Sequence, residues 1–219
     1  MKKPVLRPVN ALALALSLFA LAPLAQAQDA KAGEKKAAMC IGCHGIPGYQ
    51  ASFPEIYKVP MISGQGAKYI VSALTAYKKG ERKHPTMRAI AGSLSDQDMA
   101  DLAAFYAGNA GGGAAPDTAS AAPADVQKLL EKGNCASCHG PNFSKPIDPS
   151  YPKLAGQHSD YLYAALKAYQ TDNNAQVGRG NAIMAGMAKP FSHTELKALA
   201  DYIGSQQGEL RTVAESRFR

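Results

Sequence analysis

The sequence contains Cys40-Ile41-Gly42-Cys43-His44-Gly45 and, later, Cys135-Ala136-Ser137-Cys138-His139-Gly140. These two segments hold all four cysteines of the 219-residue chain. In each copy two residues separate the cysteines, a histidine follows the second cysteine, and a glycine follows the histidine. The duplicated unit predicts two similar domains, each built around its own copy.

The similarity continues downstream of both units. Residues 60–65 (PMISGQ) align with residues 152–157 (PKLAGQ), and two tyrosines follow at equal spacing in each copy. Further on, Met87 aligns with Met184, each at the same distance before a Leu-Ser or Phe-Ser pair. A duplicated ancestral unit with small loop insertions explains this pattern.

Sequence rich in Gly, Ala and Pro separates the two copies. Residues 109–123 cannot bury an apolar face and are typical of a flexible linker. We therefore expect domain 1 over residues 28–115 and domain 2 over residues 116–219. Domains of this size have marginal apolar cores, so a large apolar cofactor would supply much of the missing buried surface.

The first 27 residues have the form of a secretory signal that is removed on export. An apolar run extends to Leu21, and Ala25-Gln26-Ala27 is a small-x-small cleavage pattern. The run is short for a membrane span, and no later stretch is long and apolar enough to be one. The basic residues that open the signal are Lys2, Lys3 and Arg7.

The formal net charge is +7, and the basic start of the signal accounts for part of it. The small remaining excess gives no support for nucleic-acid binding, and export argues against it. We therefore expect no nucleic-acid partner.

Hydrophobic periodicity predicts an all-α protein, because no segment shows a convincing alternation with period two. Ser95 and Ser192 are expected N-caps, the second in a capping box, and Gly80 is expected to end a helix. The expected helices cover residues 30–38, 67–79, 96–107, 126–132, 161–170 and a segment after Ser192.

The Cys-x-x-Cys-His unit indicates c-type haem attachment. Its two thiols add to the two vinyl groups of a haem, and the two-residue gap lets both sulfurs reach one edge of the porphyrin. The following histidine then ligates the iron. We predict two covalent haem c groups, with thioether bonds from Cys40, Cys43, Cys135 and Cys138 and iron ligation by His44 and His139.

Three other interpretations of the cysteines stay open. A Cys pair can form a redox disulfide, but that motif usually occurs once in a chain. Two pairs can form a Cys₄ zinc site, but the distant pairs would have to converge and both histidines would have no role. Two structural disulfides would be strained at this spacing.

Methionine is the usual companion of histidine on the iron of electron-transfer cytochromes. The repeat selects Met87 and Met184, because the other methionines align with different residues. Met187 is the second choice in domain 2, and His84 is an alternative ligand in domain 1. Met99 is expected to fill the core.

The free N–H of each proximal imidazole needs an acceptor, which fixes the orientation of the ring. Pro60 and Pro152 align in the repeat, and their carbonyl groups are the predicted acceptors.

The full order of motifs resembles the dihaem cytochrome c4 family. This order is Cys-x-x-Cys-His-Gly, then Pro-x-x-x-Gly-Gln-x-x-x-Tyr, then Met-x-x-x-x-x-x-Leu/Phe-Ser, found twice behind a signal. The resemblance implies two class I cytochrome c domains, related by approximate two-fold symmetry and each wrapped around one haem. It also implies a periplasmic electron carrier between a quinol-oxidising complex and a terminal oxidase or reductase. Such a carrier associates loosely with the inner membrane, is no independent catalyst and has no small-molecule substrate.

Domain 1 carries a basic segment around Met87 that the aligned loop of domain 2, residues 170–181, lacks. These cations could surround an exposed haem edge and steer an acidic redox partner. The other interpretation is a solvated helix end, where cations are favoured. The residues are Lys78, Lys79, Arg82, Lys83 and Arg88.

Two other functions stay open. The chain could be the electron-accepting subunit of a periplasmic dehydrogenase, such as a flavocytochrome c sulfide dehydrogenase. It could also be a dihaem peroxidase or a thiosulfate-oxidising enzyme, which would need one iron with a vacant or labile ligand position.

Overall fold

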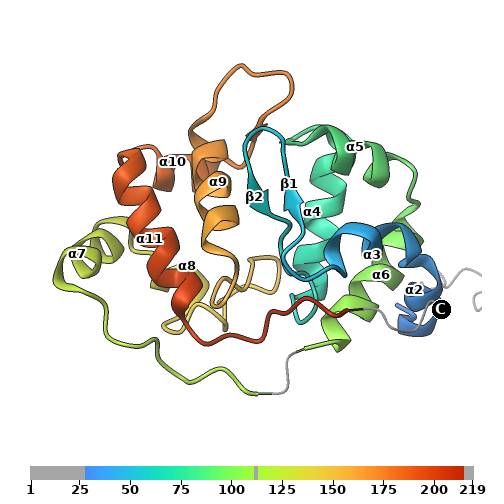
Figure 1. The fold of residues 1–219 in the computed structure, drawn as a ribbon, viewed down its shortest axis with the longest axis horizontal. Helices are drawn as coiled ribbons and strands as arrows, with labels where there is room; N and C mark the ends of the chain where they lie inside the picture. Colours follow the sequence, from blue (N-terminus) through green and yellow to red (C-terminus); the bar gives the residue numbers. More distant parts are fainter. Residues whose placement is uncertain (1–27, 111–112, 215–219) are drawn as a thin grey trace, which may run out of the picture.

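The structure, a computed structural model, describes residues 28–110 and 113–214. The predicted signal at residues 1–27 lies outside these ranges. No helix in the described ranges is long and apolar enough to cross a membrane. Figure 1 shows two helical units side by side, domain 1 in blue to green and domain 2 in yellow to red.

Both domains are built from short helices and two-residue strands. Domain 1 contains α2 (Ala30–Lys36), α3 (Ala38–His44), β1 (Gln50–Ala51), β2 (Tyr57–Lys58), α4 (Ala67–Lys79), β3 (Arg82–Lys83), α5 (Pro85–Gly92) and α6 (Asp96–Gly108). Domain 2 contains α7 (Ala124–Gly133), α8 (Ala136–His139), α9 (Ser159–Gln170), β4 (Gly178–Arg179), α10 (Ala182–Ala188) and α11 (His193–Ser205). The predicted helical class is confirmed. Helices α3, α5, α8 and α10 were not among the expected helices.

The sequence signals for helix ends act as expected. Gly80 ends α4 with φ 76°, in the left-handed region that glycine occupies without steric cost. Ser95 and Ser192 begin α6 and α11, each in a capping box closed by an acidic residue three positions later. These caps fix where the last helix of each domain begins.

The apolar core of each domain is small. In domain 1 helix α6 packs against α2 and α4, and in domain 2 helix α11 packs against α9 and α7. The buried core of domain 1 is Ala37, Ile70, Leu94, Met99, Leu102, Ala103 and Tyr106. That of domain 2 is Phe143, Ala155, Leu162, Ala200 and Ile203, with a second cluster of Phe191, Leu196 and Leu199.

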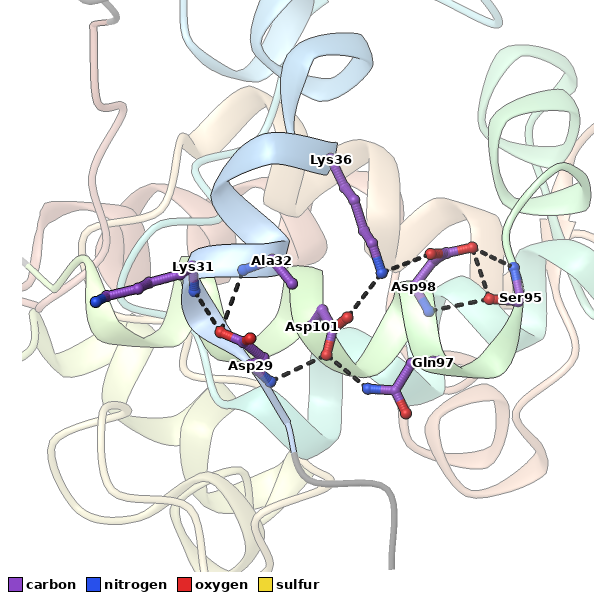
Figure 2. A network of polar contacts seen from close by, with 8 residues as sticks. All are labelled: Asp29, Lys31, Ala32, Lys36, Ser95, Gln97, Asp98 and Asp101. Atoms are coloured by element: carbon purple, nitrogen blue, oxygen red, sulfur yellow. Dashed lines mark hydrogen bonds and ion pairs between the residues drawn. The ribbon is translucent and has the colours of Figure 1, made fainter.

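A buried carboxylate joins the first and last helices of domain 1 (Figure 2). Asp101 of α6 is 2% exposed. One carboxylate oxygen accepts the N–H of Asp29 at 3.0 Å and the side-chain amide of Gln97 at 2.6 Å. The other accepts from Lys36 at 2.7 Å, and Lys36 also pairs with Asp98. The hydrogen bond from Lys36 keeps the pKa of Asp101 below its usual value.

Replacing Asp101 by alanine is expected to destabilise domain 1 by about 2–3 kcal/mol, because three hydrogen bonds are lost and the Asp29 N–H is left without its acceptor. Urea unfolding measures the loss. Asp201→Ala removes a carboxylate from an exposed pair with Lys197 on α11 and should change stability little. Equal effects of the two variants would contradict this account of Asp101.

The two domains meet along a symmetric seam. Strand β3 of domain 1 pairs antiparallel with β4 of domain 2, so that Arg82 lies opposite Arg179. The chain after α11 crosses to domain 1, where Arg211 forms a bridge with Ser63 and donates from Nε to the carbonyl of Asn109 at 2.8 Å. Each domain therefore contributes main chain to the other's surface.

Part of the predicted linker forms hydrogen bonds with domain 2. The carbonyl of Pro116 accepts from Asn142 at 2.7 Å. Ser120 donates to Gln206 at 2.8 Å, and its carbonyl accepts from Tyr202 at 2.6 Å. Residues 116–120 are thus attached to the domain that follows them.

Candidate haem-attachment sites

The two Cys-x-x-Cys-His units lie on short helices early in each domain. Cys40, Cys43 and His44 belong to α3, and Cys138 and His139 belong to α8, with Cys135 at its N-cap. A helical turn therefore carries each cysteine pair and its histidine, as haem attachment requires.

The geometry does not support the other interpretations of the cysteines. Neither motif pair is joined by a disulfide in the structure. Within the described ranges, no three His, Cys, Asp or Glu side chains come together to form a metal site. The two Cys pairs therefore do not converge on a shared zinc site.

Each motif histidine is held by the proline carbonyl of its own domain. The Nδ1 of His44 lies 2.8 Å from the carbonyl oxygen of Pro60, and that of His139 lies 3.1 Å from the carbonyl oxygen of Pro152. A carbonyl can only accept, so Nδ1 carries the proton and Nε2 keeps a free lone pair. Burial lowers the pKa of both imidazoles, which favours this neutral form. Both rings are thus in the tautomer that ligates iron through Nε2.

The two aligned methionines occupy equivalent helix starts. Met87 lies in the first turn of α5, and Met184 lies in the first turn of α10. The N–H of Met87 donates to the Nδ1 of His84 at 3.4 Å, and that of Met184 donates to the side chain of Asn181 at 3.0 Å. These aligned N-caps hold the backbone of each methionine in the same way.

The remaining candidate ligands differ in their surroundings. Met187 is 47% exposed, whereas Met184 is half-buried. Met99 is 1% exposed and belongs to the core of domain 1. The ring of His84 caps α5 and contacts Phe53 edge-on, with the ring centroids 6.4 Å apart. A capping role accounts for His84 without iron ligation.

Replacing Asn181 by alanine is expected to cost about 1 kcal/mol of stability, because α10 loses its N-cap and the Met184 N–H loses its acceptor. Denaturant unfolding measures the cost. Thr194→Ala, an exposed change in the first turn of α11, should be nearly neutral. No difference between these variants would mean that Asn181 does not hold the helix start.

Sequence reasoning missed a cluster of arginines and tyrosines between the domains. Arg82 donates to the hydroxyl of Tyr69 at 3.1 Å and to that of Tyr161 at 2.6 Å. Arg179 donates to the same Tyr161 hydroxyl at 3.0 Å and also lies over the ring of Tyr169. The cluster joins repeat-related residues from both domains.

Among the described residues, no carboxylate balances the two positive charges of this cluster. The ion pairs of the described residues involve lysines and neither of the two arginines. The Nε of Arg82 is buried and has no hydrogen bond within those same residues. Burial tends to raise the pKa of Tyr161, but Arg179 and Arg82 outweigh it and lower that pKa to about 8. Two adjacent guanidiniums without a carboxylate form a setting for an anionic group.

The structure places the predicted basic segment in three environments. Arg82 belongs to the interdomain cluster, where it donates to Tyr69 and Tyr161. Lys78 donates to the carbonyl of Leu94 at 2.6 Å, and Lys83 donates to that of Asn174 at 2.5 Å. Lys79 and Arg88 are exposed. Arg82 is therefore held between the domains, and docking of a partner at the basic segment stays a prediction.

Comparison with known proteins agrees with this architecture. A cytochrome c family model matches residues 30–107 and again residues 123–207. The cytochrome c4 of Stutzerimonas stutzeri is 33% identical over 193 residues, which cover 81% of this chain and 89% of that protein. This chain belongs to the cytochrome c4 family.

A solved structure and a second relative are also similar to this chain. The crystal structure of reduced recombinant cytochrome c4 from Pseudomonas stutzeri matches with a TM-score of 0.60 at 27% identity, covering 83% of this chain and 100% of that one. The thiosulfate dehydrogenase electron acceptor of Stutzerimonas stutzeri (strain A1501) is 32% identical over 202 residues, which cover 88% of this chain and 91% of that protein.

Membership establishes the cofactor and the general role. The chain is a dihaem cytochrome with two covalent haem c groups, and it acts in electron transfer. The two predicted cytochrome c domains are confirmed.

Proposed function

We propose that this cytochrome c4 is a periplasmic carrier that moves single electrons between a quinol-oxidising complex and a terminal oxidase or reductase. The observation that supports a carrier most directly is the pair of equivalent histidine sites. Both proximal candidates are neutral, are held through Nδ1 and belong to domains that repeat one plan. Among the described residues, the two histidines make equivalent contacts, which suits two haems with the same role.

His44 and Met87 ligate the first iron, and His139 and Met184 ligate the second. The thioether bonds come from Cys40 and Cys43 in domain 1 and from Cys135 and Cys138 in domain 2. A haem bound in this way supplies a reversible one-electron couple at iron. With two protein ligands on each iron, no position is left for a substrate.

Arg82 and Arg179 are suitable partners for the acidic groups of the cofactors. Each haem carries two propionate carboxylates, and the arginine pair lacks a carboxylate among the described residues. The buried Nε of Arg82 without a hydrogen bond supports this role. The guanidiniums would neutralise propionate charge between the domains, where a lone carboxylate would be costly.

The second candidate function is the electron-accepting subunit of a sulfur-compound dehydrogenase. The specific observation is the 32% identity to a thiosulfate dehydrogenase electron acceptor. The sequence left open a flavocytochrome c sulfide dehydrogenase as such a partner, whereas this similarity favours a thiosulfate enzyme. Export to the periplasm and loose association with the inner membrane stay predictions.

Optical spectra of the native protein test the carrier assignment. We expect two haems per chain, both low-spin with a His/Met spectrum, and no reaction with carbon monoxide. A high-spin or carbon monoxide-binding haem would contradict a pure carrier and direct attention to an enzymatic substrate. Isolation of a stable complex with a dehydrogenase from native extracts would favour the second candidate.

Lys79 and Arg88 are proposed to steer an acidic redox partner towards domain 1. We expect Lys79→Glu with Arg88→Glu to slow reduction by such a partner roughly tenfold at low ionic strength and to weaken the salt dependence. Stopped-flow kinetics measure the rate.

Lys35→Glu with Lys128→Glu is the matched control, because it changes the net charge equally at exposed positions on other helices. Equal rates for the two double variants would contradict docking at Lys79 and Arg88.

A further inference from the structure

Two buried glutamines cross between the domains in a reciprocal pattern. Gln65 and Gln157 align in the repeat and are 5% and 4% exposed. The Oε1 of Gln157 accepts the N–H of Met61 at 3.0 Å, and its Nε2 donates to the Met61 carbonyl at 2.9 Å. Likewise, the Oε1 of Gln65 accepts the N–H of Lys153 at 2.9 Å, and its Nε2 donates to the Lys153 carbonyl at 3.0 Å. Each glutamine thus binds one residue of the other domain through both of its polar atoms.

One bond of each glutamine, the bond that accepts a main-chain N–H, ends on the peptide group that holds a motif histidine. The N–H of Met61 and the carbonyl of Pro60 belong to one peptide group, and that carbonyl accepts from His44 at 2.8 Å. One planar unit therefore links Gln157 of domain 2 to His44 of domain 1.

The equivalent link in the other direction runs from Gln65 of domain 1 to His139 of domain 2. The N–H of Lys153 and the carbonyl of Pro152 form a single peptide group. That N–H donates to Gln65, and that carbonyl accepts from His139 at 3.1 Å. Neither link uses a histidine and a glutamine of the same domain.

The orientation of each amide is fixed by its neighbours. The Oε1 of Gln157 also accepts the N–H of His158 at 3.0 Å, and the Oε1 of Gln65 also accepts the N–H of Gly66 at 2.9 Å. A flipped amide would place its NH₂ group against two N–H donors, so only one orientation satisfies both contacts. The glutamine oxygen therefore faces the peptide N–H in both links.

A hydrogen bond at one end of a peptide group strengthens the bond at the other end. Accepting the N–H increases the negative charge on the carbonyl oxygen, by a cooperative effect of about 10–30% per bond in a low-dielectric interior. A stronger acceptor at Nδ1–H makes the imidazole a more basic ligand. A more basic ligand stabilises the oxidised iron and lowers the reduction potential.

From these links we propose that Gln157 and Gln65 are positioning residues that act across the interface. Gln157 holds and polarises the peptide group behind His44, and Gln65 does the same behind His139. Each domain thereby sets the orientation and basicity of the proximal histidine of the other. The inference rests on the proposed ligation by these two histidines, and it makes the two potentials depend on an intact interface.

The test replaces each glutamine by methionine, which has similar volume and cannot form either bond. The potentials of the two haems are measured by spectroelectrochemical titration, and the Nδ1–H signals of His44 and His139 are followed by NMR of the reduced, histidine-labelled protein. We expect Gln157→Met to raise the potential of the domain 1 haem and to move the His44 signal. We expect Gln65→Met to act on the domain 2 haem and on His139.

Gln206→Met is the matched control. Gln206 is 5% exposed, and its hydrogen bonds to Ser120, Tyr202 and Ser205 remain within domain 2. It should shift neither the His44 signal nor the domain 1 potential. If a methionine variant fails to fold, Gln157→Asn takes its place, because the shorter amide loses the contact and stays polar.

Shifts confined to the domain that carries the substitution would overturn the proposal, as would equal shifts in both haems or no shift at all. An incorrect assignment of the iron ligands would be detected by a separate observation. In that case the unmodified protein would lack the His/Met spectrum before any glutamine is changed.

Discussion

Met87→Ala and Met184→Ala, made separately, are each expected to convert one of the two haems to a high-spin form that binds carbon monoxide. The thioether sulfur is the proposed sixth ligand, and alanine leaves that position open. Each variant should bind one carbon monoxide per chain, while the second haem keeps its native spectrum. The potential of the altered haem should fall, because methionine ligation raises it.

The outcome in domain 2 also distinguishes two neighbouring methionines. Met187 lies one helical turn after Met184 on α10 and is 47% exposed. We expect Met187→Ala to leave both haems low-spin. A native spectrum for Met184→Ala together with carbon monoxide binding by Met187→Ala would transfer the ligand assignment to Met187.

The sequence predicted the parts of the fold that depend on local chemistry. The helix over residues 67–79 begins and ends where expected. Its end is fixed by Gly80, which adopts a left-handed conformation that other residues disfavour. Ser95 and Ser192 cap their helices, because a short hydroxyl side chain can accept the first N–H groups of the helix. Such signals lie within a few residues of the feature that they determine.

The repeat gave information about the site that local signals could not give. It selected Pro60 and Pro152 as acceptors for the motif histidines, and the structure places both carbonyls at hydrogen-bond distance. Alignment of the two copies works here because each contact lies within one domain. Equivalent positions then make equivalent contacts.

Contacts between the domains were missed, because alignment of the two copies predicts only contacts within one domain. Although Arg179 stands in a loop that was predicted to lack the basic character of the Arg82 segment, the repeat showed that Gln65 and Gln157 are counterparts. It did not show that the counterparts face each other, because that depends on how two separately folded units dock. Arg82 was consequently assigned to a solvent-facing patch, although its side chain donates to tyrosines of both domains.

Replacing both Cys135 and Cys138 by alanine is expected to reduce the haem content from two to one per chain and to unfold domain 2. Eight buried apolar side chains form the two core clusters of that domain. So small a core leaves a domain of this size marginal unless a large apolar group fills its centre. Mass spectrometry measures the loss of one haem, and circular dichroism measures the loss of helix.

The effect should spread to domain 1, but only in part. Domain 1 has its own core and its own covalent haem site, so its helices should persist. It loses the Gln157 bond to Met61 and the pairing of β3 with β4, which removes contacts close to His44. The remaining haem should stay low-spin but have a shifted potential. Full helix content in the double variant would contradict the view that the haem completes the core of domain 2.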